Sequence, residues 1–257
     1  MAFINYITQI YIDFGAVQLL RTECERTGMR KPLIVTDAGV RAAGVLHQAL
    51  KALGDLPHAV FDQTPSNPTE AAVRAAVLVF KANGCDGLIA VGGGSSIDLV
   101  KGLAIAATHE GSLKTYATIE GGSPKISERV LPLIAVPTTA GTGSEVARGA
   151  IVIVDDGRKL GFHSWHLVPK IAILDPELTL GLPPLLTAAA DRRHRHGRDC
   201  ALHGNLHGAG HQSARRRHCA GRPGDSLEGR ASQRPRADQA GAGRQLSAKV
   251  NVGTTRG

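Results

Sequence analysis

Two short segments rich in glycine, serine and threonine have the composition of phosphate-binding loops. The first, GGGSSIDLVK at residues 92–101, follows the apolar run 87–91. Consecutive glycines leave no Cβ between the backbone and a ligand, and the free N–H groups and dipole of a helix N-terminus attract anions. The segment therefore predicts a buried strand, a sharp turn and a helix that receives a pyrophosphate, with Ser95 or Ser96 capping that helix.

The second segment, PTTAGTGSEV at residues 137–146, also follows an apolar run. Four hydroxyl side chains lie within it, more than a purely structural turn needs: Thr138, Thr139, Thr142 and Ser144. The first segment alone is equally consistent with a tight connection, since it is neither a GxGxxG fingerprint nor a P-loop. The second segment favours ligand binding by both.

Asp37 follows the apolar run 32–36. A carboxylate at the end of the second strand of a nucleotide-binding unit can accept hydrogen bonds from the adenosine ribose and repel a 2′-phosphate. This position therefore predicts a preference for NAD over NADP. The alternative is that Asp37 caps a helix that starts near Val40.

Six apolar runs alternate with helical patterns and are typical of strands in an α/β protein: 7–14, 32–36, 58–61, 87–91, 133–136 and 171–174. This alternation predicts a Rossmann-like, mostly parallel sheet. We expect it to form one domain over residues 1–186. The chain shows neither a signal-peptide pattern nor an apolar stretch that could span a membrane. Its four cysteines, which are not closely paired in the sequence, fit a reducing cytoplasm.

Residues 187–257 differ in kind from this domain. The chain carries a formal charge of +8, and from Asp191 onward 14 Lys and Arg face 5 Asp and Glu, so the basic excess lies in the tail. The tail has no Phe, Tyr or Trp, and cannot bury enough apolar surface to offset its chain entropy. We therefore expect a basic, disordered tail without specific nucleic-acid recognition.

The two loop segments resemble those of the iron-containing, or group III, alcohol dehydrogenases, which share a fold with dehydroquinate synthase and glycerol dehydrogenase. The resemblance covers roughly residues 7–186 and includes VTD at 35–37, PSNPT at 65–69, KLG at 159–161 and ILDPEL at 173–178. It implies that the glycine turn holds the NAD(P) pyrophosphate and that the threonine loop lies along the rest of the cofactor. The implied cofactor-binding residues are Asp37, Asn67, Gly93, Gly94, Ser95, Asp98, Thr138, Thr139, Thr142, Ser144 and Lys159.

The resemblance also implies an all-helical C-terminal domain, in which one Asp and three His hold Fe²⁺ or Zn²⁺, and a homodimer. Read one nucleotide later, the codons possible for residues 194–208 allow Thr-Gly-Met-Asp-Ala-Ile-Ala-His-Cys-Met-Glu-Thr-Phe-Met. This run contains Asp-x-x-x-His, with two ligands on one helix face, where the family has its first two metal ligands. We interpret residues 187–257 as the frameshifted start of the metal domain, with the switch between Leu186 and His194.

The predicted function is hydride transfer between a small alcohol, or its carbonyl, and NAD with the aid of a divalent metal. The metal domain is absent or corrupted in this chain, so we expect the 257-residue protein to be inactive, and assign it no catalytic residue and no metal ligand. Maleylacetate reductase and glycerol dehydrogenase remain alternatives within the enzymes. A nucleotide-binding domain whose basic tail binds polyanions is the alternative outside them.

Overall fold

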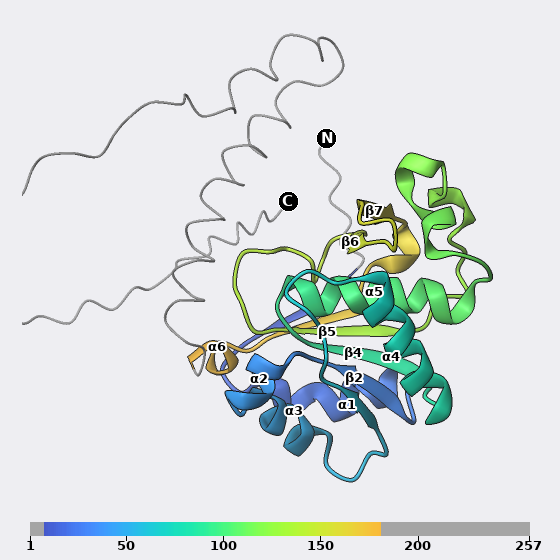
Figure 1. Ribbon diagram of the computed structural model, residues 1–257. Helices are drawn as coiled ribbons and strands as arrows, with labels where there is room; N and C mark the ends of the chain where they lie inside the picture. The colour runs from blue at the N-terminus through green and yellow to red at the C-terminus, as the bar shows by residue number, and fades with distance from the viewer. Residues whose placement is uncertain (1–7, 181–257) are drawn as a thin grey trace, which may run out of the picture. The chain divides into compact units, whose positions relative to one another are not determined.

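The computed structural model describes residues 8–180, which form an α/β unit around a six-stranded parallel sheet (Figure 1). The strand order is β1-β8-β5-β4-β2-β3. The strands are β1 Gln9–Ile12, β2 Pro32–Val35, β3 Ala59–Phe61, β4 Gly87–Gly92, β5 Leu133–Pro137 and β8 Ile171–Leu174. All six predicted strands are confirmed, as is the Rossmann-like class, and only their ends differ by a few residues.

Alternate side chains of the strands enter two separate cores, because successive residues of a strand point to opposite faces of its sheet. In β4, Leu88 and Ala90 belong to the core on one face, whereas Ile89 and Val91 belong to the core on the other. Both faces of the sheet are therefore covered, which explains why the strands read as continuous apolar runs.

Helices lie on both faces of the sheet (Figure 1). The longer pair, α4 Glu70–Ala82 and α5 Gly94–Thr108, packs against one core. The other face carries α1 Leu20–Arg26, α2 Ala38–Ala42 and α3 Val45–Leu53. The remaining helical segments are short: η1 Ala16–Leu19, η2 Leu113–Tyr116, η3 Thr118–Glu120, η4 Ser123–Lys125, η5 Trp165–Leu167 and α6 Glu177–Leu180.

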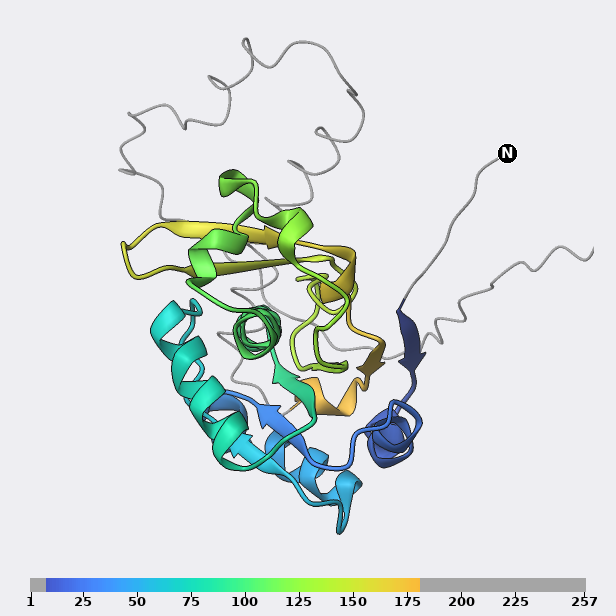
Figure 2. The ribbon, with the colours of Figure 1, turned by 90° about the vertical axis from the view of Figure 1, so that its right-hand side faces the viewer.

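A two-stranded antiparallel hairpin, β6 Gly149–Ile153 and β7 Lys159–His163, covers α5 on the side away from the sheet (Figure 2). The sequence prediction missed it. Its signal is nonetheless present, because Asp156 and Gly157 form a hairpin-type turn between two half-buried strands with alternating exposure. The hairpin makes α5 a buried central helix, with the sheet on one side and β6 on the other.

No helix among residues 8–180 is both long and apolar enough to cross a membrane. The predicted domain boundary after residue 186 and the predicted tail lie outside the described residues, so both remain predictions.

Candidate functional site

The two predicted loop segments meet at the carboxyl edge of the sheet. There β4 lies between β2 and β5, and the chain reverses its direction of strand addition between β2 and β4. In open α/β sheets, ligands bind outside the carboxyl ends of the strands at such a switch point. The residues that follow these strands are therefore at the position where a ligand site is expected.

The glycine turn connects β4 directly to α5. Gly93 is the N-cap residue of α5, and no side chain accepts a hydrogen bond from the first turn of the helix. The predicted serine cap is wrong: Ser95 Oγ instead donates to the carbonyl of Ser66 at 2.5 Å, and the buried Ser96 Oγ has no hydrogen-bond partner. The first-turn N–H groups of a long helix are thus left free of side-chain caps, as an anion site requires.

The threonine loop packs directly on this turn, and the fit depends on glycine. A Cβ on Gly93 would lie 3.0 Å from Thr139 Oγ1, and a Cβ on Gly94 would lie 3.2 Å from Thr142 Cγ2 and 3.4 Å from Ser144 Oγ. The tertiary structure therefore brings the two segments together. It also corrects one detail, because a Cβ on Gly94 would point into the loop and not toward a ligand.

Asp37 performs the capping role that was its alternative interpretation. Its Oδ1 accepts the N–H of Val40 at 2.9 Å, at the start of α2. The second carboxylate oxygen lies toward the glycine turn, since a Cβ on Gly92 would be 3.5 Å from Oδ2. One oxygen thus caps α2, and the other stands beside the predicted pyrophosphate site.

Three further predicted residues make contacts at the rim of this region. Asn67 Oδ1 accepts a hydrogen bond from the ammonium of Lys159 at 3.1 Å, so these two exposed side chains lie together. Asp98 Oδ2 accepts the N–H of Ile151 in β6 at 3.1 Å. Burial raises the pKa of Asp98, although the bond from Ile151 and the charge of Lys101 oppose this. Asp98 therefore links α5 to the hairpin, a role that sequence reasoning did not foresee.

The sequence alone assigned no role to Lys101. Its side chain is fully buried, and its Nζ donates to three backbone carbonyls, those of Ser144, Ala147 and Gly149. Burial lowers its pKa to about 8, and the carboxylates of Asp98 and Glu145 partly offset that effect. Its burial could have been predicted from the sequence, because Lys101 lies four residues after the apolar Ile97 and therefore on the same, buried side of the helix.

Buried hydroxyl groups without partners gather around the same edge: Thr36, Thr64, Ser96 and Thr138. Thr36 directly follows β2 and Thr138 directly follows β5, and the N–H of Thr138 donates to the carbonyl of Gly92 at 3.0 Å. Buried polar groups are rarely left unpaired unless a ligand or water serves them. Together with the uncapped helix N-terminus, they fit the phosphate and sugar groups of a nucleotide.

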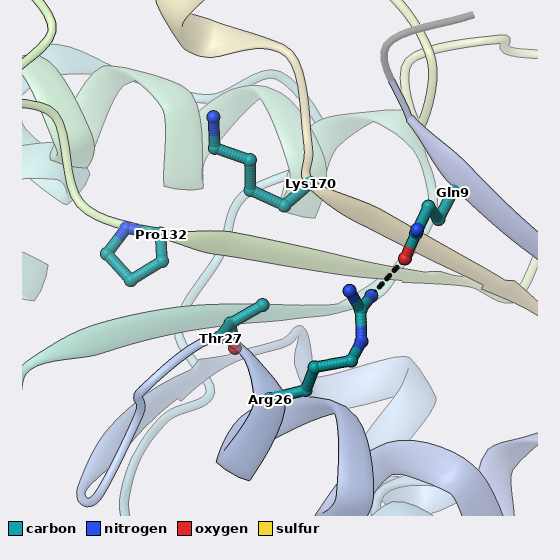
Figure 3. A pocket seen from close by; sticks show the side chains of 5 residues that line it. All are labelled: Gln9, Arg26, Thr27, Pro132 and Lys170. Carbon is teal, nitrogen blue, oxygen red and sulfur yellow. Dashed lines mark hydrogen bonds between the residues drawn. The ribbon is translucent and has the colours of Figure 1, made fainter.

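A separate hollow lies at the opposite, amino edge of the sheet (Figure 3). Its volume is about 350 Å³, and its lining residues precede strands or follow α1: Gln9, Arg26, Thr27, Pro132 and Lys170. The guanidinium of Arg26 is bonded to Gln9 and Glu23. Among residues 8–180, no three His, Cys, Asp or Glu side chains are grouped closely enough to hold a metal ion. The segment expected to carry the metal ligands lies beyond these residues.

Comparison with known proteins gives a consistent result. Residues 8–176 match the family of iron-containing alcohol dehydrogenases. The chain is 70% identical over 189 residues to a 4-hydroxybutyrate dehydrogenase of Cupriavidus necator, covering 74% of this chain and 50% of that protein. It is 40% identical over 192 residues to a 1,3-propanediol dehydrogenase of Klebsiella pneumoniae, covering 72% of this chain and 49% of that protein.

Among solved structures, the sulfoacetaldehyde reductase of Bifidobacterium kashiwanohense in complex with NAD⁺ matches with a TM-score of 0.67 and 30% identity, over 74% of this chain and 50% of that one. The chain thus spans about half the length of the relatives it matches. The matched half contains the glycine turn, the threonine loop and the parallel sheet.

Proposed function

The chain belongs to the iron-containing alcohol dehydrogenase family, and from this premise we propose that residues 8–180 are the cofactor-binding half of an NAD-dependent dehydrogenase. The relative at 70% identity acts, by its name, on 4-hydroxybutyrate. We therefore propose that the substrate is a short hydroxy acid or a related small alcohol, oxidised to its carbonyl.

One observation carries the cofactor assignment: the uncapped N-terminus of α5 lies under the threonine loop at the switch point of the sheet. The backbone N–H groups of Gly94 and Ser95 would bind the pyrophosphate. Thr138, Thr139, Thr142 and Ser144 would line the cofactor, with Asn67, Asp98 and Lys159 at the rim. Fixing the nicotinamide in this way orients one reactant of hydride transfer.

The second reactant needs an activated oxygen. A divalent metal, Fe²⁺ or Zn²⁺, would supply this chemistry by polarising the alcohol oxygen and stabilising the alkoxide. Its expected ligands belong to the helical domain that we propose was lost to the shifted frame of residues 187–257. We therefore propose that the 257-residue chain binds NAD but does not turn over alcohol.

We further propose that the intact enzyme is a cytoplasmic homodimer. Cys24 and Cys85 are buried free thiols, as a reducing compartment allows. Strand β1 is one edge of the sheet and exposes Ile10 and Ile12, and Phe14 just after it is exposed as well. An exposed apolar edge strand favours pairing with another copy.

Substitution of Gly94 tests the cofactor site. Gly94→Val should weaken NAD binding by at least about 2 kcal/mol, or about 30-fold, because the added atoms force Thr142 and Ser144 away from the turn. Isothermal titration calorimetry measures the affinity, and a melting curve checks the fold. Ala82→Val, at the exposed end of α4, is the matched control. Unchanged NAD affinity in Gly94→Val would show that the cofactor does not bind at this turn.

The basic tail supports a second candidate function, non-specific polyanion binding by residues 191–257. Such binding weakens steeply as the salt concentration rises. Salt-sensitive binding to mixed-sequence DNA that disappears on removal of residues 187–257, in a chain with no measurable NAD affinity, would favour this function over the dehydrogenase.

A further inference from the structure

We propose that Lys101 is a positioning residue that holds the 138–149 loop over the glycine turn and so shapes the NAD site without touching the cofactor. The proposal rests on the proposed function, because it assigns to Lys101 the task of preparing that same site. It does not make Lys101 a phosphate ligand, since its three N–H groups are already occupied.

The geometry around Nζ is that of a complete internal site. The carbonyl oxygens of Ser144, Ala147 and Gly149 lie at 2.7, 2.7 and 2.9 Å from Nζ. An ammonium group has three N–H donors, and each has one carbonyl acceptor here. A buried ammonium is costly unless it is fully hydrogen-bonded, and so are buried carbonyls. The lysine and the loop backbone therefore satisfy each other.

The loop's other hydrogen bonds to the rest of the protein lie at its two ends, where the N–H of Thr138 donates to the carbonyl of Gly92 at 3.0 Å and the N–H of Ser164 donates to the carbonyl of Arg148 at 3.1 Å. Within it, the N–H of Ser144 reaches Thr142 Oγ1 at 3.4 Å, and the N–H of Val146 reaches the carbonyl of Gly143 at 3.2 Å. The stretch 140–142 is exposed. The three bonds from Lys101 are shorter and carry a charge, and such bonds are roughly twice as strong as neutral ones. They are the main attachment of this part of the loop to α5.

The same helix carries the other parts of the arrangement. Gly94, at its first turn, leaves room for Thr142 and Ser144, which would lie 3.2 and 3.4 Å from an added Cβ. Asp98, one turn later, accepts the N–H of Ile151. Lys101 lies a further turn along and holds the carbonyls between these two points. The glycine turn and the loop are thereby fixed to one rigid element, which is how a binding site is prepared before its ligand arrives.

Three variants test this inference in the full chain. Lys101→Met keeps most of the side-chain volume and removes the N–H donors. Lys101→Ala leaves a cavity that propylammonium can refill, whereas 1-propanol fills it without three charged donors. Lys81→Met is the matched control, because Lys81 is exposed on α4. NAD affinity is measured by calorimetry, and hydrogen exchange is followed in peptides that cover residues 138–151 and 87–92.

We expect Lys101→Met to bind NAD at least about tenfold more weakly than the wild type. Exchange should be faster by about tenfold in 138–151 and unchanged in β4. Propylammonium should restore the NAD affinity of Lys101→Ala, and propanol should not. A Lys101→Met variant with wild-type loop exchange and NAD affinity would overturn the proposal. Equal rescue of Lys101→Ala by propanol would also overturn it, because Lys101 would then only fill space.

Failure of the proposed function can be distinguished from failure of the role proposed for Lys101. If the wild-type chain does not bind NAD, the cofactor assignment is wrong. The exchange experiment then still decides whether Lys101 holds the loop. If Lys101→Met does not fold, the Lys101→Ala variant prepared with either additive answers the same question.

Discussion

At the scale of single residues, several side chains near the glycine turn have a structural contact in addition to the ligand contact that we propose for them. Asp37 uses Oδ1 to cap α2, and Ser95 uses its hydroxyl to hold the 65–69 loop through the carbonyl of Ser66. Such double use favours ligand binding, since a side chain fixed by one hydrogen bond presents its remaining atoms in one orientation. It also means that a simple truncation of Asp37 would mix stability with specificity.

Asp37→Asn separates the two roles, because Asn caps a helix as well as Asp but has no charge. We expect the ratio of NAD to NADP affinity to fall by at least about tenfold as repulsion of the 2′-phosphate is removed. The melting temperature should stay unchanged. Asp37→Ala, which also removes the cap, should lower the free energy of unfolding by about 1 kcal/mol. If Asp37→Asn leaves the affinity ratio at its wild-type value, Asp37 is a helix cap alone.

At the scale of elements, α5 organises this half of the molecule. Its first turn forms the proposed anion site, its buried face carries Lys101, and its last residues anchor the segment that leads to β5. There, His109 Nε2 accepts the N–H of Ser127 at 2.9 Å, so the proton of the neutral ring is on Nδ1, facing Thr108 Oγ1 at 2.8 Å. Burial lowers the pKa of His109, and the charges of Arg129 and His166 act in the same direction.

This geometry predicts a loss of stability in mild acid. The folded-state pKa of His109 lies below its unfolded value of 6.5, so below about pH 6.5 the unfolded chain binds more protons and the free energy of unfolding falls. The free energy of unfolding stops falling once the pH is below the folded-state pKa. Protonation would also break the bond from Ser127. Chemical denaturation at pH 7 and pH 5 should show a smaller loss for His109→Gln than for the wild type. His47→Gln, at an exposed position, should behave like the wild type; equal losses in all three proteins would contradict the assignment.

At the scale of the whole molecule, we propose that the chain corresponds to one half of a two-part enzyme. It matches about half the length of its relatives, and the matched half contains the parts that we propose bind and orient NAD. Hydride transfer needs the substrate oxygen to be polarised next to the nicotinamide, and a metal contributes several kcal/mol of charge stabilisation to that step. Cofactor binding alone leaves the alcohol unactivated.

Correction of the reading frame tests this division. Deleting one base, or adding two, near codon 190 should restore the helical metal domain if the downstream gene is intact, and with it alcohol-dependent formation of NADH that a chelator abolishes. The 257-residue chain with Fe²⁺ or Zn²⁺ added should form none, while it still binds NAD. Chelator-sensitive turnover by the uncorrected chain would refute the frameshift interpretation.

The sequence by itself determined the strands of the parallel sheet. The clearest were β2, β4 and β5, because a strand buried on both faces must be apolar at every position. It also located the glycine turn and the threonine loop, since tight turns and ligand hydroxyls restrict residue type locally. The β6–β7 hairpin had a local signal as well, in Asp156-Gly157 between alternating residues, but its half-buried strands are less distinct than the continuous apolar runs.

Only the tertiary structure decided which atoms meet. It placed Thr142 against Gly94 and Asn67 beside Lys159, and it directed the ammonium of Lys101 to three carbonyls more than 40 positions along the chain. Residue type and spacing describe what a side chain can do, whereas its partner depends on how distant segments pack. The predicted serine cap was wrong for the same reason. The hydroxyl of Ser95 bonds to the carbonyl of Ser66, which is distant in the sequence and is brought close only by the fold.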